Sequence, residues 1–203
     1  MKIKENKQYN KILIANFIYI SGAFLICYIL KDIPLFIRYN NYVKIIYLLL
    51  IAITLKFIVD VFTYQRLDYI YILFSFFSYL GVLFITLYVR DNTNVNIVED
   101  PRYIKIWIKL IFVNYTVFIN LIYNILLFVP LGIFISFINM EYIYKLLIIT
   151  IFIILNELIQ YVYKLGVFDY IDIILNIIGT CIGYILIKIK KGEKYGQRKQ
   201  KAT

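Results

Sequence analysis

The sequence contains no histidine among its 203 residues, and only two cysteines, one tryptophan and three prolines. Without histidine, the chain has no Ser-His-Asp or Cys-His catalytic arrangement and no histidine-containing zinc site. Cys27 and Cys181 both fall within long apolar runs, where we expect them to pack as small apolar side chains. We therefore expect no bound metal and no cofactor, with one alternative that is given below.

Charge is also scarce, because only 17% of the residues are charged whereas 63% are hydrophobic and 19% are aromatic. Soluble domains are nearer to half apolar, and several runs here approach the ~20 residues that cross a hydrocarbon core. The sequence predicts an all-α, polytopic membrane helical bundle with about six transmembrane helices plus a short interfacial helix. It offers no folded basic module for binding a nucleic acid.

The expected spans follow the apolar runs, and basic residues flank the first and the last of them. The spans are 11–30, 43–62, 69–89, 118–137, 144–163 and 168–187, and the interfacial helix is 103–114, anchored by Trp107. The net charge of the chain is +10, and many of its lysines lie in the two terminal tails. By the positive-inside rule we expect a multi-pass protein of the cell membrane with both termini cytoplasmic, including a basic tail at 189–203 that contacts anionic membrane lipids.

Lys56 and Asp60 are charged residues inside the second expected span. They are four residues apart, so they can neutralise each other on one helix face. Alternatively, both lie near the cytoplasmic end and reach water with their long side chains. We favour the second interpretation.

The most informative stretch is 156–184, where polar residues interrupt two apolar runs that we expect to form a hairpin with a turn near 164–166. Such groups are costly in a membrane and usually face a bundle interior or a substrate path. In an antiparallel hairpin, residues at equal distances from the turn lie at equal depth in the membrane. Glu157 and Asp172 are equally far from the turn, and so are Gln160 and Asp169. With the asparagines of the fourth span, we expect one water-accessible polar pocket in the outer half of the membrane, formed by Asn120, Asn124, Glu157, Gln160, Asp169, Asp172 and Asn176.

A second group of residues is expected to serve helix packing. Gly179 and Gly183 continue the stripe of Asp172 and Asn176 at helical spacing, which leaves a bare surface for close approach of a neighbouring helix. Pro130 and Gly132 lie near the end of the fourth span, where they typically kink or end a helix.

Three segments together resemble the VanZ-like family of membrane proteins. NLIYNILLFVPLG at 120–132 is similar to its N-x-x-x-N-x-x-x-F-x-P-x-G signature, and the pair of Glu157 and Gln160 resembles its E-x-x-Q. FDYIDIILNIIGTCIGY at 168–184 resembles its F-D-x-x-D-x-x-x-N-x-x-G-x-x-x-G-Y block. The resemblance covers 69–188 and leaves 1–68 as a basic tail with two added spans. Leu165-Gly166 stands where the family usually has Gly-Arg.

The resemblance implies an envelope protein of Gram-positive bacteria with a role in low-level resistance to glycopeptide antibiotics such as teicoplanin. Besides transport coupled to protons or cations, three interpretations of the polar pocket stay open on the residues alone. It binds the head group of a lipid-linked cell-wall precursor, or the antibiotic itself. It performs acid/base catalysis, or catalysis with Mg²⁺ or Ca²⁺ held by its carboxylates, on a lipid-linked substrate. In the third interpretation its side chains only hold the helices together, as a scaffold without a ligand.

Overall fold

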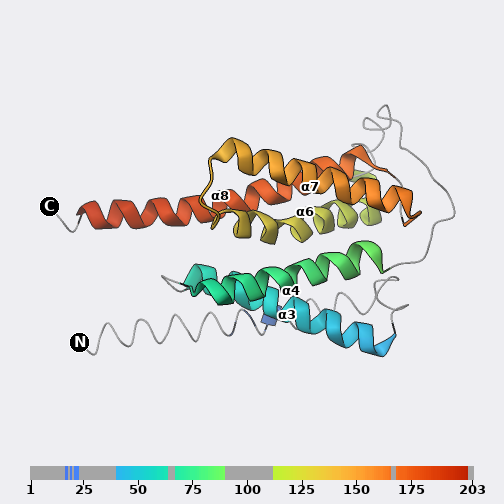
Figure 1. Ribbon diagram of the computed structural model, residues 1–203, viewed down its shortest axis with the longest axis horizontal. Helices are drawn as coiled ribbons and strands as arrows, with labels where there is room; N and C mark the ends of the chain where they lie inside the picture. Colours follow the sequence, from blue (N-terminus) through green and yellow to red (C-terminus); the bar gives the residue numbers. More distant parts are fainter. Residues whose placement is uncertain are drawn as a thin grey trace. The chain divides into compact units, whose positions relative to one another are not determined.

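The computed structural model describes residues 17, 19, 21, 22, 40–63, 67–89, 112–165 and 168–200. Its main elements are the helices α3 (Asn41–Thr63), α4 (Tyr69–Tyr88), α6 (Tyr115–Ile135), α7 (Tyr142–Val162) and α8 (Tyr170–Gln200) (Figure 1). Helix α8 continues well past the end of the expected span at residue 187 and into the basic tail.

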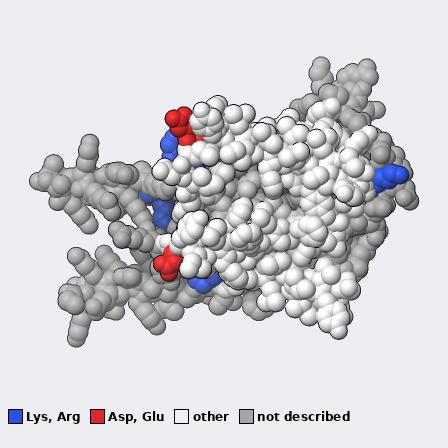
Figure 2. All heavy atoms as spheres, viewed as in Figure 1, with Lys and Arg blue, Asp and Glu red and all other residues white. Residues whose placement is uncertain are grey.

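Five helices in the described part of the chain are long and apolar enough to cross a membrane. On the face drawn in Figure 2, nearly all described surface atoms belong to uncharged residues, as contact with lipid requires. The all-helical, membrane-type architecture is thereby confirmed. The expected first span at 11–30 and the interfacial helix at 103–114 lie largely outside the described residues, so the full set of six spans plus an interfacial helix stays a prediction.

The chain divides into two compact units, 1–89 and 90–203. Helices α3 and α4 belong to the first unit, and α6, α7 and α8 belong to the second. Our proposed boundary between residues 68 and 69 rests on the extent of the family resemblance and stays a prediction.

In the first unit, α3 and α4 pack side by side through aromatic and polar side chains. The Tyr47 hydroxyl lies 2.7 Å from Thr86 Oγ1 in a buried hydrogen bond. The buried ring of Phe57 meets the Tyr71 ring edge-to-face, with 6.0 Å between their centroids. These contacts hold the two helices in register.

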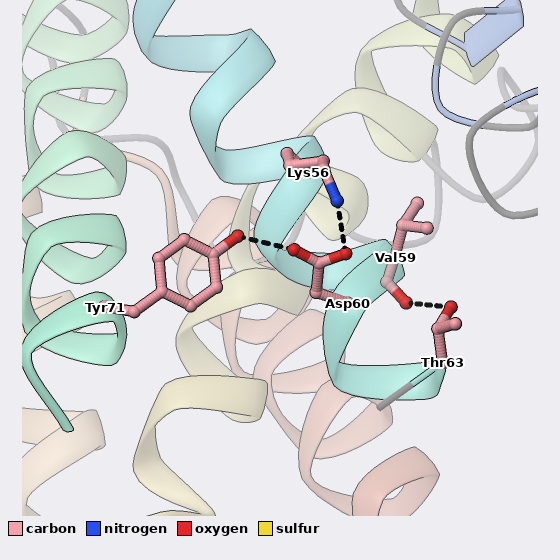
Figure 3. A network of polar contacts seen from close by, with 5 residues as sticks. All are labelled: Lys56, Val59, Asp60, Thr63 and Tyr71. Atoms are coloured by element: carbon pink, nitrogen blue, oxygen red, sulfur yellow. Dashed lines mark hydrogen bonds and ion pairs between the residues drawn. The ribbon is translucent and has the colours of Figure 1, made fainter. Parts of the chain in front are cut away.

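Asp60 is the centre of a charged network within this unit, shown in Figure 3. Lys56 Nζ forms an ion pair with Asp60 Oδ1, and the Tyr71 hydroxyl donates a 2.8 Å hydrogen bond to Asp60 Oδ2. Asp60 is only 7% exposed. The interpretation that Asp60 reaches water is therefore wrong, because two neighbouring side chains, one from α3 and one from α4, supply its hydrogen bonds inside the unit.

In the second unit, α8 packs extensively along α6 and less extensively against α7. Gly179 of α8 lies against the backbone carbonyl of Ile125, and Gly183 lies against that of Val129. The second contact lies four residues further along both helices than the first, so α6 and α8 run parallel. A Cβ at either glycine would overlap the carbonyl oxygen of α6, so only glycine permits this approach.

The α6 side of the same contact contains Pro130 and Gly132. Gly132 lies against the Thr180 backbone carbonyl, so the close approach uses glycine from both helices. Pro130 is buried, and α6 continues past it to Ile135. The proline therefore does not end the helix at this position.

The connection from α7 to α8 reverses the chain between residues 163 and 169. Lys164 has a positive φ of 56°, a conformation that closes the turn after α7. At the start of α8, Asp169 Oδ1 accepts a 2.7 Å hydrogen bond from the Ile171 N–H and so caps the helix. Burial raises the pKa of Asp169, and hydrogen bonds from the Ile171 and Asp172 backbone N–H groups partly oppose that rise.

We expect Gly179→Ala to destabilise the second unit, because its methyl group would meet the rigid backbone of Ile125. Overpacking of this kind costs about 1–3 kcal/mol. The matched control is Gly81→Ala, whose methyl group would approach only the end of the flexible Leu50 side chain, at 2.8 Å. Thermal unfolding of the purified full chain in detergent, followed by circular dichroism, measures both. Equal losses for the two variants would contradict the role of the close contact.

For the cap of α8, we expect Asp169→Ala to lower stability by about 1 kcal/mol, whereas Asp169→Asn keeps an acceptor oxygen and loses little. Because the pKa of Asp169 is raised on folding, the folded state binds this proton more tightly. Stability should therefore fall as pH rises from the ordinary pKa of an aspartate through the raised one. Unfolding measured across acidic pH should show this dependence in the wild type and not in Asp169→Asn.

Candidate functional site

The polar residues singled out in the sequence lie at one end of the second unit. Asn120 and Asn124 lie in the first half of α6, and α8 begins at the same end because the two helices are parallel. Helix α7 ends there, two residues after Gln160. The starts of α6 and α8 and the end of α7 therefore place the candidate residues at the same end of the unit.

A hydrogen bond between side chains joins α6 to α8 at this end. Asn124 Nδ2 donates to Asp172 Oδ1, between two residues that are half-buried. The contact lies on the same stripe of α8 as Gly179, about two helical turns nearer the start of the helix. The glycine contact brings the helices close enough for this short amide to reach the carboxylate.

Helix α7 buries one polar face, formed by Asn156, Glu157 and Gln160. Glu157 is only 4% exposed. Asn156 donates through Nδ2 to the Phe152 carbonyl at 2.7 Å, within its own helix. Sequence reasoning did not select Asn156, although its spacing of four residues from Gln160 places the two on the same face of the helix.

The helix ends give a second way to pair the residues of the hairpin by depth. Because α7 ends at Val162 and α8 begins at Tyr170, Gln160 and Asp172 each lie two residues inside their helix. Counting from the turn in the sequence pairs Gln160 with Asp169 instead, and which of the two pairs shares a depth in the membrane stays a prediction.

Asn176 is the most deeply buried candidate on α8, at 4% exposure. Its Oδ1 accepts no hydrogen bond from any residue that the structure describes. A buried amide oxygen without a donor loses the stabilisation that water would give it.

Two of the seven predicted residues contribute less to this cluster. Asn120 is exposed on α6, and Asp169 serves as the cap of α8. Asn124, Asp172 and Asn176 of α6 and α8, and Asn156, Glu157 and Gln160 of α7, are buried or half-buried at this end of the unit. The Asn124–Asp172 hydrogen bond joins two of them, and a meeting of all six in one site stays a prediction. We name these six residues the polar cluster.

The polar cluster contains two carboxylates and four amides, so it offers oxygen acceptors and also the N–H donors of the amides. Across the described ranges, no group of three or more His, Cys, Asp or Glu side chains is arranged to hold a metal ion. A water-accessible cavity at this end stays a prediction.

Comparison with known proteins bears on the identity of the chain. The sequence model of the family described as VanZ/LLP1 matches residues 44–191. The match begins within α3, earlier than the resemblance noted from residue 69, and it includes the polar cluster and the glycine contact. No curated protein and no solved structure matches the chain. Because the family match spans well over half of the sequence, the chain belongs to the VanZ/LLP1 family.

Proposed function

We propose that this protein binds the polar head group of a cell-wall lipid precursor, or a glycopeptide antibiotic, at the polar cluster of α6, α7 and α8. Binding at this site contributes to low-level resistance to teicoplanin-type glycopeptides in the envelope of a Gram-positive bacterium. Family membership supports the envelope context, and the polar cluster supports a ligand.

The observation that carries this proposal is the buried polar face of α7. Three adjacent polar side chains, Asn156, Glu157 and Gln160, are buried within a helix that is apolar enough to span a membrane. Burial of a carboxylate at such a position is costly, and residues of this kind usually mark a substrate path. Packing alone would be served better by the apolar residues that fill the rest of α7.

The acceptor groups of the polar cluster indicate a ligand that carries hydrogen-bond donors. Glu157 and Asp172 suit ammonium groups and hydroxyls, which are the donors of amino sugars and of glycopeptides. The Asn176 oxygen is a further acceptor for a hydroxyl. A pyrophosphate bears only acceptors, so we place the sugar or peptide portion of a precursor at the cluster, not its pyrophosphate.

The charge distribution along α8 supports an outward-facing cluster. Helix α8 begins at the cluster and runs toward Lys188, Lys190 and the basic tail. Basic residues favour the cytoplasmic side of a membrane. We therefore propose that both termini are cytoplasmic and that the cluster faces the outside of the cell.

Two other functions use the same residues. An enzyme acting on a lipid-linked substrate would use Glu157 and Asp172 as an acid/base pair. A scaffold would use the Asn124–Asp172 hydrogen bond only to join its helices. We favour binding over both, because the Asn176 oxygen without a described donor is of no use to a scaffold, and no nucleophile is marked beside the carboxylates.

We expect Asp172→Asn and Glu157→Gln each to abolish protection against teicoplanin in cells that depend on this protein. Each change keeps the shape of the side chain and removes the charge. The loss of one hydrogen bond to a charged group costs about 1.5–3 kcal/mol, or about tenfold or more in affinity. The measurement is growth inhibition by teicoplanin, with membrane abundance followed by immunoblot.

The matched control for both variants is Glu141→Gln, which removes an exposed carboxylate at the opposite end of α7. It should leave protection unchanged. Unchanged protection in Asp172→Asn and Glu157→Gln as well would exclude a charged site and favour the scaffold. Turnover of a lipid-linked muropeptide by the purified protein, lost in the same variants, would instead establish the enzyme.

The proposed orientation in the membrane predicts on which side the C-terminus lies. Green fluorescent protein fused after Thr203 should fluoresce, because that end of α8 is expected to be cytoplasmic, and alkaline phosphatase fused there should be inactive. The opposite pair of results would place the polar cluster on the cytoplasmic side and remove any direct access to an external antibiotic.

A further inference from the structure

A cavity of about 90 Å³ lies at the opposite end of α7 from the polar cluster. It is bounded by the end of α6 at Ile135, by Tyr142, Lys145 and Ile149 of α7, and by Thr180 and Tyr184 of α8. Most of its wall is apolar. Its volume accommodates about three groups of the size of a water molecule, which corresponds to a short length of hydrocarbon chain.

Lys145 is the one charged residue of this wall. It lies one turn into α7, where a lysine would ordinarily extend its side chain to the membrane surface. It is instead only 7% exposed. Its ammonium nitrogen lies 5.4 Å from the centre of the Tyr184 ring, an arrangement that favours the cation.

Basic side chains exceed acidic ones among the described residues around the cavity. None of the residues that line it is acidic, and the acidic residue nearest to it in the chain, Glu141, is exposed at the position before α7. The first turn of α7 adds the positive end of a helix dipole beside Lys145. Lys188 follows Tyr184 by one turn of α8 and is exposed.

We propose that this cavity binds an anionic phospholipid, with the single phosphate of the head group paired with Lys145. The first part of one acyl chain fills the apolar space between α7 and α8. Because most of the wall is apolar, a ligand that fills the cavity carries a hydrocarbon chain as well as the negative charge. The membrane that surrounds these helices supplies such a molecule.

This lipid site does not depend on the proposed function of the polar cluster. Lys145 and Gln160 lie at opposite ends of α7, so each site can be removed without the other. The lipid would stabilise the contact between α7 and α8, which is less extensive than that between α6 and α8.

The test uses the purified full chain in a zwitterionic detergent, with thermal unfolding followed by circular dichroism. The probes are dioleoyl phosphatidylglycerol, dioleoyl phosphatidylcholine and inorganic phosphate. We expect only phosphatidylglycerol to raise the unfolding temperature. In Lys145→Met, the concentration of phosphatidylglycerol needed for half of the effect should rise about tenfold or more, as the loss of about 1.4 kcal/mol or more of binding free energy requires. Lys145→Arg should retain the effect.

The matched control is Lys188→Met, which removes an exposed charge from the same end of α8 and should change the response little. If Lys145→Met does not fold, Cys181→Phe keeps the ammonium and fills the cavity, and it should weaken the response in the same way. Equal responses of the wild type to both lipids would overturn the proposal. So would an undiminished response in Lys145→Met or Cys181→Phe, or full stabilisation by inorganic phosphate alone.

Discussion

The close parallel contact between α6 and α8 is the constraint on which the second unit depends. Gly179 and Gly183 lie directly against backbone carbonyls of α6, with no side chain between the two helices. In a membrane, lipid tails are as apolar as leucine, so helices associate through packing and hydrogen bonds and not through burial of apolar surface. Small residues on both helices make that packing possible.

The same contact determines where polar groups can meet. Asp172 and Asn176 continue the stripe of the glycines toward the start of α8, and Asn124 lies opposite on α6. Side chains as short as asparagine and aspartate can join only if the two backbones are near. The glycines therefore support the polar cluster indirectly, by holding the two helices at the distance that the Asn124–Asp172 hydrogen bond requires.

Helix α7 differs in chemistry between its two ends. Near its end it contributes the buried Glu157 and its amide neighbours, whereas near its start it contributes the buried Lys145 beside an apolar cavity. Carboxylate and amide groups therefore lie toward one end of the helix and a buried cation toward the other. We infer that the main role of α7 is to bring polar groups to both ends of the α6–α8 pair.

The sequence by itself determined the membrane class, the helical architecture and the family, because apolar runs of membrane-spanning length and motifs at helical spacing are local properties. It also indicated the candidate polar residues, since Glu157 and Asp172 are conspicuous within apolar helices. Only the tertiary structure decided which of them meet. Asn120 lies exposed, Asp169 caps a helix, and Asn156 joins the buried face of α7.

Two further features depended on contacts between helices. The partners of Asp60 come from both α3 and α4, so the burial of its carboxylate could not be read from the i,i+4 spacing alone. In the sequence, Lys145 resembles any basic residue near the end of a span, whereas in the structure it is buried and its nitrogen lies over the ring of Tyr184, which is distant in the sequence. Periodicity determines which face of a helix a residue occupies, but the neighbour that covers that face is determined only when the helices pack.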